Sequence, residues 1–175
     1  MSRQQLQLLR SDNRFAALRP EDLNEDETTS LVDLALQALA LRHRPGKKIQ
    51  SPRDAISYFR LLLAPRRKEV FACLFLDNTH RILAVEELFE GTLTQASVYP
   101  REVVLSALRA NAAAVLFAHN HPSGDPTPSR CDEKITKVLK DALVLLDIRV
   151  LDHIVVGAEG VVSMAENGFD FGGRC

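Results

Sequence analysis

The sequence predicts a mixed α/β (α+β) domain in which helices flank a central mixed sheet. Amphipathic helical patterns alternate along the chain with short apolar runs, and two of these runs form a hairpin pattern. A further run, residues 113–119 (AAVLFAH), is apolar at almost every position, which is typical of a strand buried on both faces. Helices interleaved with a hairpin and with buried strands indicate a sheet layered against helices.

Length and composition indicate an ordinary globular chain. Its 175 residues suggest one domain with a short extension, long enough to bury a sizeable core. Apolar residues make up 46% and charged residues 26%, and the net charge of −1 lacks the basic excess of a dedicated nucleic-acid binder. Basic clusters at residues 42–48 and 66–68 are interpreted as solvated loops, with phosphate contact as the alternative.

Cysteine usage and the N-terminal sequence predict a cytoplasmic protein. The three cysteines, Cys73, Cys131 and Cys175, are widely spaced and include no Cys-x-x-Cys pair, so a disulfide framework is not expected. Residues 1–15 lack the apolar core of a signal peptide, and no apolar run approaches the about 20 residues that span a membrane. We therefore expect a reducing compartment and no membrane association.

Residues 1–48 are expected to form an N-terminal polar segment followed by one helix. An acidic run at 21–27 precedes a helical pattern over 28–43, which the Pro-Gly pair that follows ends. The apolar positions of this helix are Leu31, Leu34, Ala35, Ala38, Leu39 and Leu41. The rest of the chain is assigned to one domain at 49–170 and a tail at 171–175.

The first half of the domain is predicted to hold a helix and a hairpin. The sequence SPRD at 51–54 is typical of a capped helix start, and the helix is expected to run to about Leu63. Residues 69–76 (EVFACLFL) and 81–89 (RILAVEELF) predict the two hairpin strands. Residues 91–98 (GTLTQASV) are expected to be a short strand or an extended segment.

Two helices and three strands are predicted in the second half. The helices are expected over 100–111 and 130–145, the second with a strong apolar face. The buried run at 113–119 lies between them and leads into a loop rich in Pro and Gly. Residues 148–156 and 160–164 predict the last strands.

The loop after the buried strand carries a candidate metal site. If the strand continues to His121, then His119 and His121 point to the same side, because strand side chains alternate. Their imidazole nitrogens can then reach one zinc ion at about 2.0–2.1 Å. Asp132, in the first turn of a helix that starts near Ser129, offers a third ligand and leaves one position open for water. The alternative is that Ser129 and Asp132 form only a capping box.

Three neighbouring side chains are weighed as further ligands. Asp125 lies on a Gly-Asp-Pro turn, where Asx-type hydrogen bonding explains it. Cys131 precedes Asp132 on a helix, about 100° around the axis, so the two side chains do not face one ion. His153 is interpreted as a structural or supporting histidine, with a ligand role as the alternative.

A hydrolytic zinc site also needs a base that takes a proton from water. Glu69 directly follows the basic cluster at 66–68 and opens an apolar strand, and an exposed strand-end charge is the alternative explanation. Glu86, Glu87 and Glu90 compete on equal terms, because spacing alone does not choose between the four glutamates.

The site residues resemble those of a known family. The pattern His119-x-His121-Pro122, followed after six residues by Ser129-x-x-Asp132, resembles the JAMM motif of the MPN+ metalloprotease fold. The chain also resembles the RadC family of bacterial proteins over about residues 50–169. The segments that carry this resemblance are 69–77 (EVFACLFLD), 91–102 (GTLTQASVYPRE), 119–125 (HNHPSGD), 128–132 (PSRCD) and 152–154 (DHI).

The resemblance implies a JAMM/MPN-like domain with a zinc site whose ligands are His119, His121 and Asp132. It also implies that Glu69 hydrogen-bonds the water at the metal and that Ser129 supplies a hydroxyl on the oxyanion side. These roles suggest a zinc-dependent hydrolase of amide bonds, a metallopeptidase or isopeptidase, whose partner is a peptide or protein substrate.

Two other functions stay open. Full-length RadC proteins carry an N-terminal helix-hairpin-helix region that suits DNA binding, whereas residues 1–48 show no such hairpins and resemble the shorter RadC-like proteins of prophages and mobile elements. A DNA-associated repair or mobile-element factor, including a nuclease, is one alternative, motivated by the two basic clusters. A non-catalytic MPN binding module is the other. The oligomeric state does not follow from the sequence.

Overall fold

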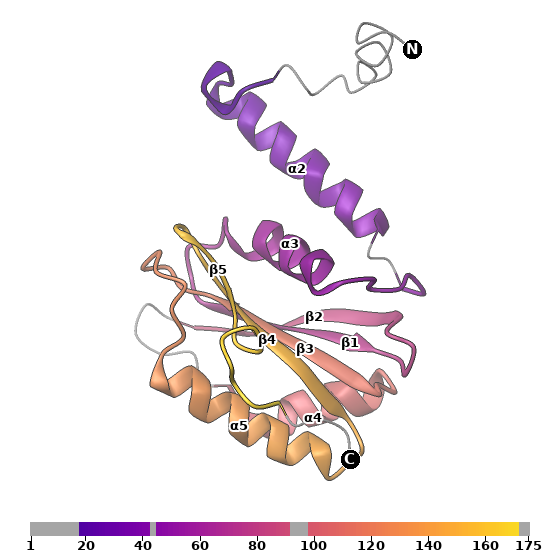
Figure 1. Cartoon of the computed structure of the whole chain (residues 1–175). Helices are drawn as coiled ribbons and strands as arrows, with labels where there is room; N and C mark the ends of the chain where they lie inside the picture. Colours follow the sequence, from indigo (N-terminus) through magenta and orange to yellow (C-terminus); the bar gives the residue numbers. More distant parts are fainter. Residues whose placement is uncertain (1–17, 43–44, 92–97, 172–175) are drawn as a thin grey trace, which may run out of the picture. The chain divides into compact units, whose positions relative to one another are not determined.

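Figure 1 shows the structure, a computed structural model that describes residues 18–42, 45–91 and 98–171. The chain divides into two compact units, Met1–Ala35 and Leu36–Cys175. Within the described residues, no helix combines the length and the apolar character that crossing a membrane requires. The segment expected at 91–98 to be a strand or extended lies outside the described residues except for its two ends, Gly91 and Val98.

The helix α2 (Glu25–Arg42) follows a short 3-10 helix, η1 (Pro20–Asp22), and begins earlier than the predicted residue 28. Asn24 caps it, because its Oδ1 accepts the Glu27 N–H at 2.9 Å and its own N–H donates to Glu27 Oε2 at 2.9 Å. The last three residues of the acidic run, Glu25, Asp26 and Glu27, therefore form the first turn of the helix instead of preceding it. Negative charge is favourable in the first turn because it faces the positive end of the helix dipole.

One mixed sheet organises the second unit. In the described part of the chain its strand order is β2-β1-β3-β4-β5, and all neighbours are antiparallel except the parallel pair β3 and β4. The strands are β1 (Val70–Leu76), β2 (Ile82–Glu90), β3 (Ala114–Asn120), β4 (Arg149–Gly157) and β5 (Gly160–Ser163). The predicted hairpin and the predicted mixed sheet are confirmed.

Helices cover both faces of the sheet (Figure 1). The helix α3 (Pro52–Leu63) packs on one face, and α4 (Pro100–Arg109) and α5 (Arg130–Val144) pack on the other. Alternate residues of β1 supply the two cores: Ala72, Leu74 and Leu76 face α3, whereas Phe71, Cys73 and Phe75 face α4 and α5. The wholly buried β1 and β3 explain why these strands read as continuous apolar runs.

The connections bring three chain segments to one edge of the sheet. The helix α5 connects the parallel strands β3 and β4, so the loop at 121–129 leaves from the carboxyl end of β3. Because β1 runs antiparallel to β3, the beginning of β1 lies at the same edge, with Phe71 opposite His119. The end of β3, the start of α5 and the start of β1 therefore converge.

Candidate metal centre

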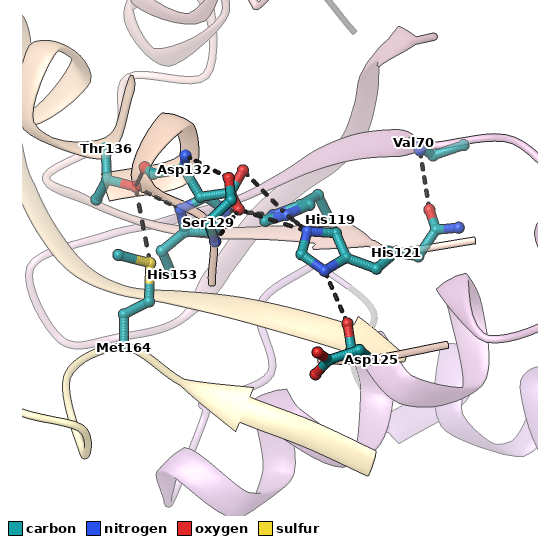
Figure 2. A network of polar contacts seen from close by, with 10 residues as sticks. Val70, His119, His121, Asp125, Ser129, Asp132, Thr136, His153 and Met164 are labelled. Atoms are coloured by element: carbon teal, nitrogen blue, oxygen red, sulfur yellow. Dashed lines mark hydrogen bonds and ion pairs between the residues drawn. The ribbon is translucent and has the colours of Figure 1, made fainter. Parts of the chain in front are cut away.

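His119, His121 and Asp132 come together at this edge (Figure 2). The Nε2 atoms of the two histidines lie 2.9 Å apart. Asp132 places Oδ1 3.4 Å from His119 Nε2 and Oδ2 3.4 Å from His121 Nε2. Among the residues that the structure describes, this is the one group of three or more His, Cys, Asp or Glu side chains close enough to hold a metal ion.

The spacing of these atoms fits a metal ion. In a tetrahedral site with bonds of about 2.0–2.1 Å, neighbouring ligand atoms are separated by roughly 3.3 Å. The two Nε2 atoms lie 2.9 Å apart, and each lies 3.4 Å from a different oxygen of the Asp132 carboxylate, so each of these separations is close to that value. Two imidazole nitrogens and one carboxylate oxygen form a donor set that suits divalent transition metals. Three protein ligands leave the fourth position open.

The end of β3 orients the two histidines as the alternation predicts. The His121 N–H donates to Val156 O at 2.8 Å, so the pairing with β4 continues beyond Asn120 and both imidazoles share one face of the sheet. His119 is 1% exposed, whereas His121 is half-buried. The His121 Nδ1–H donates to Asp125 O at 2.8 Å, which turns Nε2 toward the group.

Asp132 serves in the group and in a helix cap at the same time. Its Oδ2 accepts the Ser129 N–H at 2.6 Å, and Ser129 Oγ accepts the Asp132 N–H at 3.2 Å. The cap places the carboxylate so that both of its oxygens face the histidines. Burial alone would raise the pKa of Asp132, but its contacts with His119, His121 and Ser129 outweigh this effect and hold the pKa far below its usual range. The carboxylate is therefore ionised, as a metal ligand must be.

The other candidate ligands take supporting positions. Asp125 Oδ1 accepts the Thr127 N–H at 2.8 Å, which is the expected Asx turn. Cys131 is exposed and lies outside the metal-binding group. His153 is fully buried, its Nε2 lies 2.8 Å from His119 Nδ1, and it lies outside the group that could hold a metal ion.

The strand register separates Glu69 from the other glutamates. Phe71 lies opposite His119 in the antiparallel pair of β1 and β3, so continuing the register by two residues places Glu69 opposite His121 on the same face. The hydrogen bond to Asp132 is the largest cause that raises the pKa of His121, and the charge of Glu69 adds a smaller contribution in the same direction. Its three rivals lie on β2: Glu87 pairs with Arg66, Glu90 pairs with Lys68, and Glu86 lies opposite Cys73.

The predicted site residues line one cavity of about 310 Å³. Its polar wall contains the three side chains that could hold a metal ion, together with Glu69 and Ser129, and its apolar wall comes from β1, α5 and the segment before α4. The lining residues are Glu69, Phe71, Val98, His119, His121, Ser129, Cys131, Asp132, Ile135 and His153.

Asn120 is a residue of the site region that the sequence interpretation missed. It is 3% exposed and points to the face opposite the histidines. Its Oδ1 accepts the Val70 N–H at 2.8 Å, and its Nδ2 donates to Arg66 O at 3.2 Å and to Lys68 O at 3.0 Å. These bonds hold the backbone on both sides of Glu69. A polar residue inside a buried strand is the sequence signal that points to such a role.

Comparison with known families agrees with this architecture. The family described as the RadC-like JAB domain matches residues 49–169, which is most of the chain. The chain belongs to this family. The match spans α3, the whole sheet, α4 and α5, and therefore includes every residue of the metal-binding group.

Related proteins share the RadC-like domain at high identity. A UPF0758 protein of Acidovorax sp. (strain JS42) is 55% identical over 142 residues, which cover 81% of this chain and 60% of the relative. A UPF0758 protein of Vibrio cholerae is 53% identical over 139 residues, which cover 79% of this chain and 87% of the relative. The match thus spans about three fifths of the length of several relatives.

The loop that carries His121 packs against a glycine of the RadC-like domain. A Cβ added to Gly157 would collide with the carbonyl oxygen of Gly124 and would lie 2.8 Å from Pro126 N. We predict that Gly157→Ala displaces the loop at 121–126, because backbone atoms cannot move aside as a flexible side chain can. Overpacking of this kind costs about 1–3 kcal/mol. Thermal unfolding should show a midpoint lowered by about 5 °C, at ~2–4 °C per kcal/mol for a chain of this size.

Gly160 provides the matched control. It pairs with Gly157 across β4 and β5, and a Cβ added to it would meet only Pro126 Cγ at 3.9 Å, an ordinary contact distance. Gly160→Ala should therefore unfold near the wild-type temperature. Equal midpoints for the two alanine variants would show that the close approach of the loop to β4 does not constrain the fold.

Proposed function

We propose that the protein is a zinc-dependent hydrolase of amide bonds, a metallopeptidase or isopeptidase acting on a peptide or protein substrate. The observation that carries this proposal is the convergence of His119, His121 and Asp132 with Glu69 in one cavity. A site of this kind has three protein ligands, one open position and a carboxylate outside the ligand set, as hydrolytic zinc sites have.

The side chains of the cavity supply the remaining chemistry. A bound zinc ion would provide Lewis acidity and lower the pKa of water from about 15.7 to about 7. Glu69 accepts a proton from water as the water oxygen attacks the carbonyl carbon of the substrate amide. Glu69 then delivers this proton to the amide nitrogen as the carbon–nitrogen bond breaks. The Ser129 hydroxyl, at the start of α5, donates to the oxygen on which negative charge develops.

The geometry of Ser129 is compatible with this role. Its Oγ accepts the Asp132 N–H, which engages one oxygen lone pair and leaves the hydroxyl proton free to donate into the cavity that Ser129 lines. The resemblance of the pattern His119-x-His121 and Ser129-x-x-Asp132 to the JAMM motif further supports hydrolysis of amide bonds over other zinc chemistry.

Metal analysis combined with cleavage assays tests the proposal. The purified 175-residue chain should hold zinc in about equimolar amount. It should lose cleavage of a library of peptide and lysine ε-amide-linked substrates after chelation, and recover this cleavage when zinc is restored. A protein that holds zinc stoichiometrically but cleaves neither class of substrate would instead support a non-catalytic binding module.

The basic cluster at 66–68 does not favour the DNA-associated alternative. Arg66 forms a salt bridge to Glu87 at 2.7 Å, and Lys68 forms one to Glu90 at 2.6 Å. These carboxylates neutralise two of the three positive charges that a phosphate backbone would need. The cluster at 42–48 lies partly outside the described residues. A peptide or protein partner is therefore the one we propose.

A further inference from the structure

A chain of hydrogen bonds extends from His119 into the protein interior (Figure 2). His119 Nδ1 lies 2.8 Å from His153 Nε2, and His153 Nδ1 lies 2.6 Å from Thr136 Oγ1. Thr136 Oγ1 in turn lies 2.6 Å from the backbone carbonyl oxygen of Asp132. His153 and Thr136 are both fully buried. The chain therefore links strands β3 and β4 to helix α5 behind the metal-binding group.

The contacts determine where each proton lies. A carbonyl oxygen carries no proton, so the Thr136 hydroxyl donates to Asp132 O. The oxygen of Thr136 then accepts from His153, whose proton must lie on Nδ1. His153 is fully buried, which disfavours a charged ring, so its Nε2 keeps a lone pair that accepts the Nδ1–H of His119. His119 consequently presents an unprotonated Nε2 to His121 and Asp132, which is the form that binds a metal.

The surroundings of this chain offer His119 Nδ1 no other described partner. Phe71 and Phe117 contact the His153 ring edge-on, with centroids 5.4 and 5.9 Å away, and Phe71 also stacks on His119 at 6.5 Å. Met164 Sδ lies 3.8 Å from Thr136 Oγ1 on the remaining side. Within the described residues, every buried side-chain nitrogen and oxygen has a hydrogen-bond partner. Loss of one member would therefore leave its neighbour unpaired.

We infer that His153 and Thr136 are positioning residues of the metal centre, which hold His119 in the tautomer and orientation that direct Nε2 at the metal. This inference rests on the proposed metal-binding function. Because Thr136 donates to the backbone of Asp132, the same chain also couples the orientation of His119 to the helix that carries Asp132. Two of the three ligands thus depend on one buried network.

Paired variants test each member of the network. His153→Phe keeps a ring of similar size but removes the acceptor for His119, whereas His153→Gln keeps an amide oxygen within reach. Thr136→Val keeps the shape of the side chain but removes the hydroxyl, and Thr136→Ser restores it. Loss of a partner behind a metal-bound histidine typically weakens metal binding by about 10–100-fold. We expect that range for His153→Phe, several-fold weakening for Thr136→Val, and near wild-type zinc affinity for His153→Gln and Thr136→Ser.

Two measurements on the full chain separate positioning from folding. The zinc dissociation constant is obtained by competition with a chromophoric chelator, and thermal unfolding of the metal-free variants checks that each one folds. Two-bond ¹H–¹⁵N spectra of metal-free protein report the tautomer, and His119 should carry its proton on Nδ1 in wild type and in Thr136→Ser. In Thr136→Val and His153→Phe, the His119 ring should show a mixture of the Nδ1-protonated and Nε2-protonated tautomers.

The outcomes distinguish this inference from the proposed function. A folded His153→Phe variant that binds zinc within twofold of wild type would overturn the inference and leave the hydrolase proposal intact. If His153→Phe does not fold, equal zinc affinity of Thr136→Val and Thr136→Ser would overturn it. If wild type binds no zinc, the proposed function fails, and an Nε2-protonated His119 in metal-free wild type would overturn the inference separately.

Discussion

A variant that carries both His119→Ala and Asp132→Ala is expected to retain no zinc after purification. The two substitutions remove two of the three proposed ligands, and the remaining His121 alone does not form a chelating site. Loss of a directly bonded ligand exceeds the about 10–100-fold effect of losing an outer hydrogen-bond partner. Zinc content measured by plasma mass spectrometry, together with chelator competition, should place the affinity of the double variant below detection.

Cys131→Ser is the matched control for this experiment. Cys131 lies next to Asp132, is exposed, and lines the same cavity, but it does not belong to the metal-binding group. Its substitution should leave zinc content unchanged. A chain that loses zinc with Cys131→Ser, or keeps it without His119 and Asp132, would show that the ligand set is assigned to the wrong residues.

Local signals in the sequence predicted most of the fold. The signals that start and end helices span only a few residues. They include the capping box of Ser51 and Asp54, Pro52 at the first helical position, and Asn111 in the left-handed conformation after α4. The start of α2 was missed because the acidic residues were interpreted as preceding the helix, whereas Asn24 caps it and they form its first turn. Capping by asparagine is also a local signal, so the start of α2 at Glu25 is contained in the sequence around Asn24.

Contacts between distant segments limited what could be predicted about the site. The two histidines follow from strand alternation and Asp132 from the start of a helix, so all three are suggested by one short stretch of sequence. The position of Glu69 depends on the register of β1 against β3, and the position of His153 depends on the register of β4. Neither register can be deduced from spacing, which is why spacing left four glutamates equivalent and only the family resemblance singled out Glu69.

Glu69→Gln is expected to abolish turnover while zinc binding is kept. Glutamine preserves the size of the side chain but cannot accept a proton from water at neutral pH, so the loss should be about 10²–10⁴-fold in kcat. The KM should change little, because the base acts in the transition state and not in binding the ground state. Zinc content and unfolding temperature should match wild type, since Glu69 is not a ligand and Asn120 holds its backbone through main-chain contacts.

Glu86→Gln tests whether this loss is specific to position 69. Glu86, on β2, is half-buried like Glu69. It lies opposite Cys73 of β1 and does not line the cavity. Its substitution removes the same charge from the same sheet without removing a group from the site. Equal loss of kcat in the two variants would mean that negative charge near β1, and not a proton acceptor opposite His121, supports catalysis. Unchanged turnover in Glu69→Gln would remove Glu69 from the mechanism altogether.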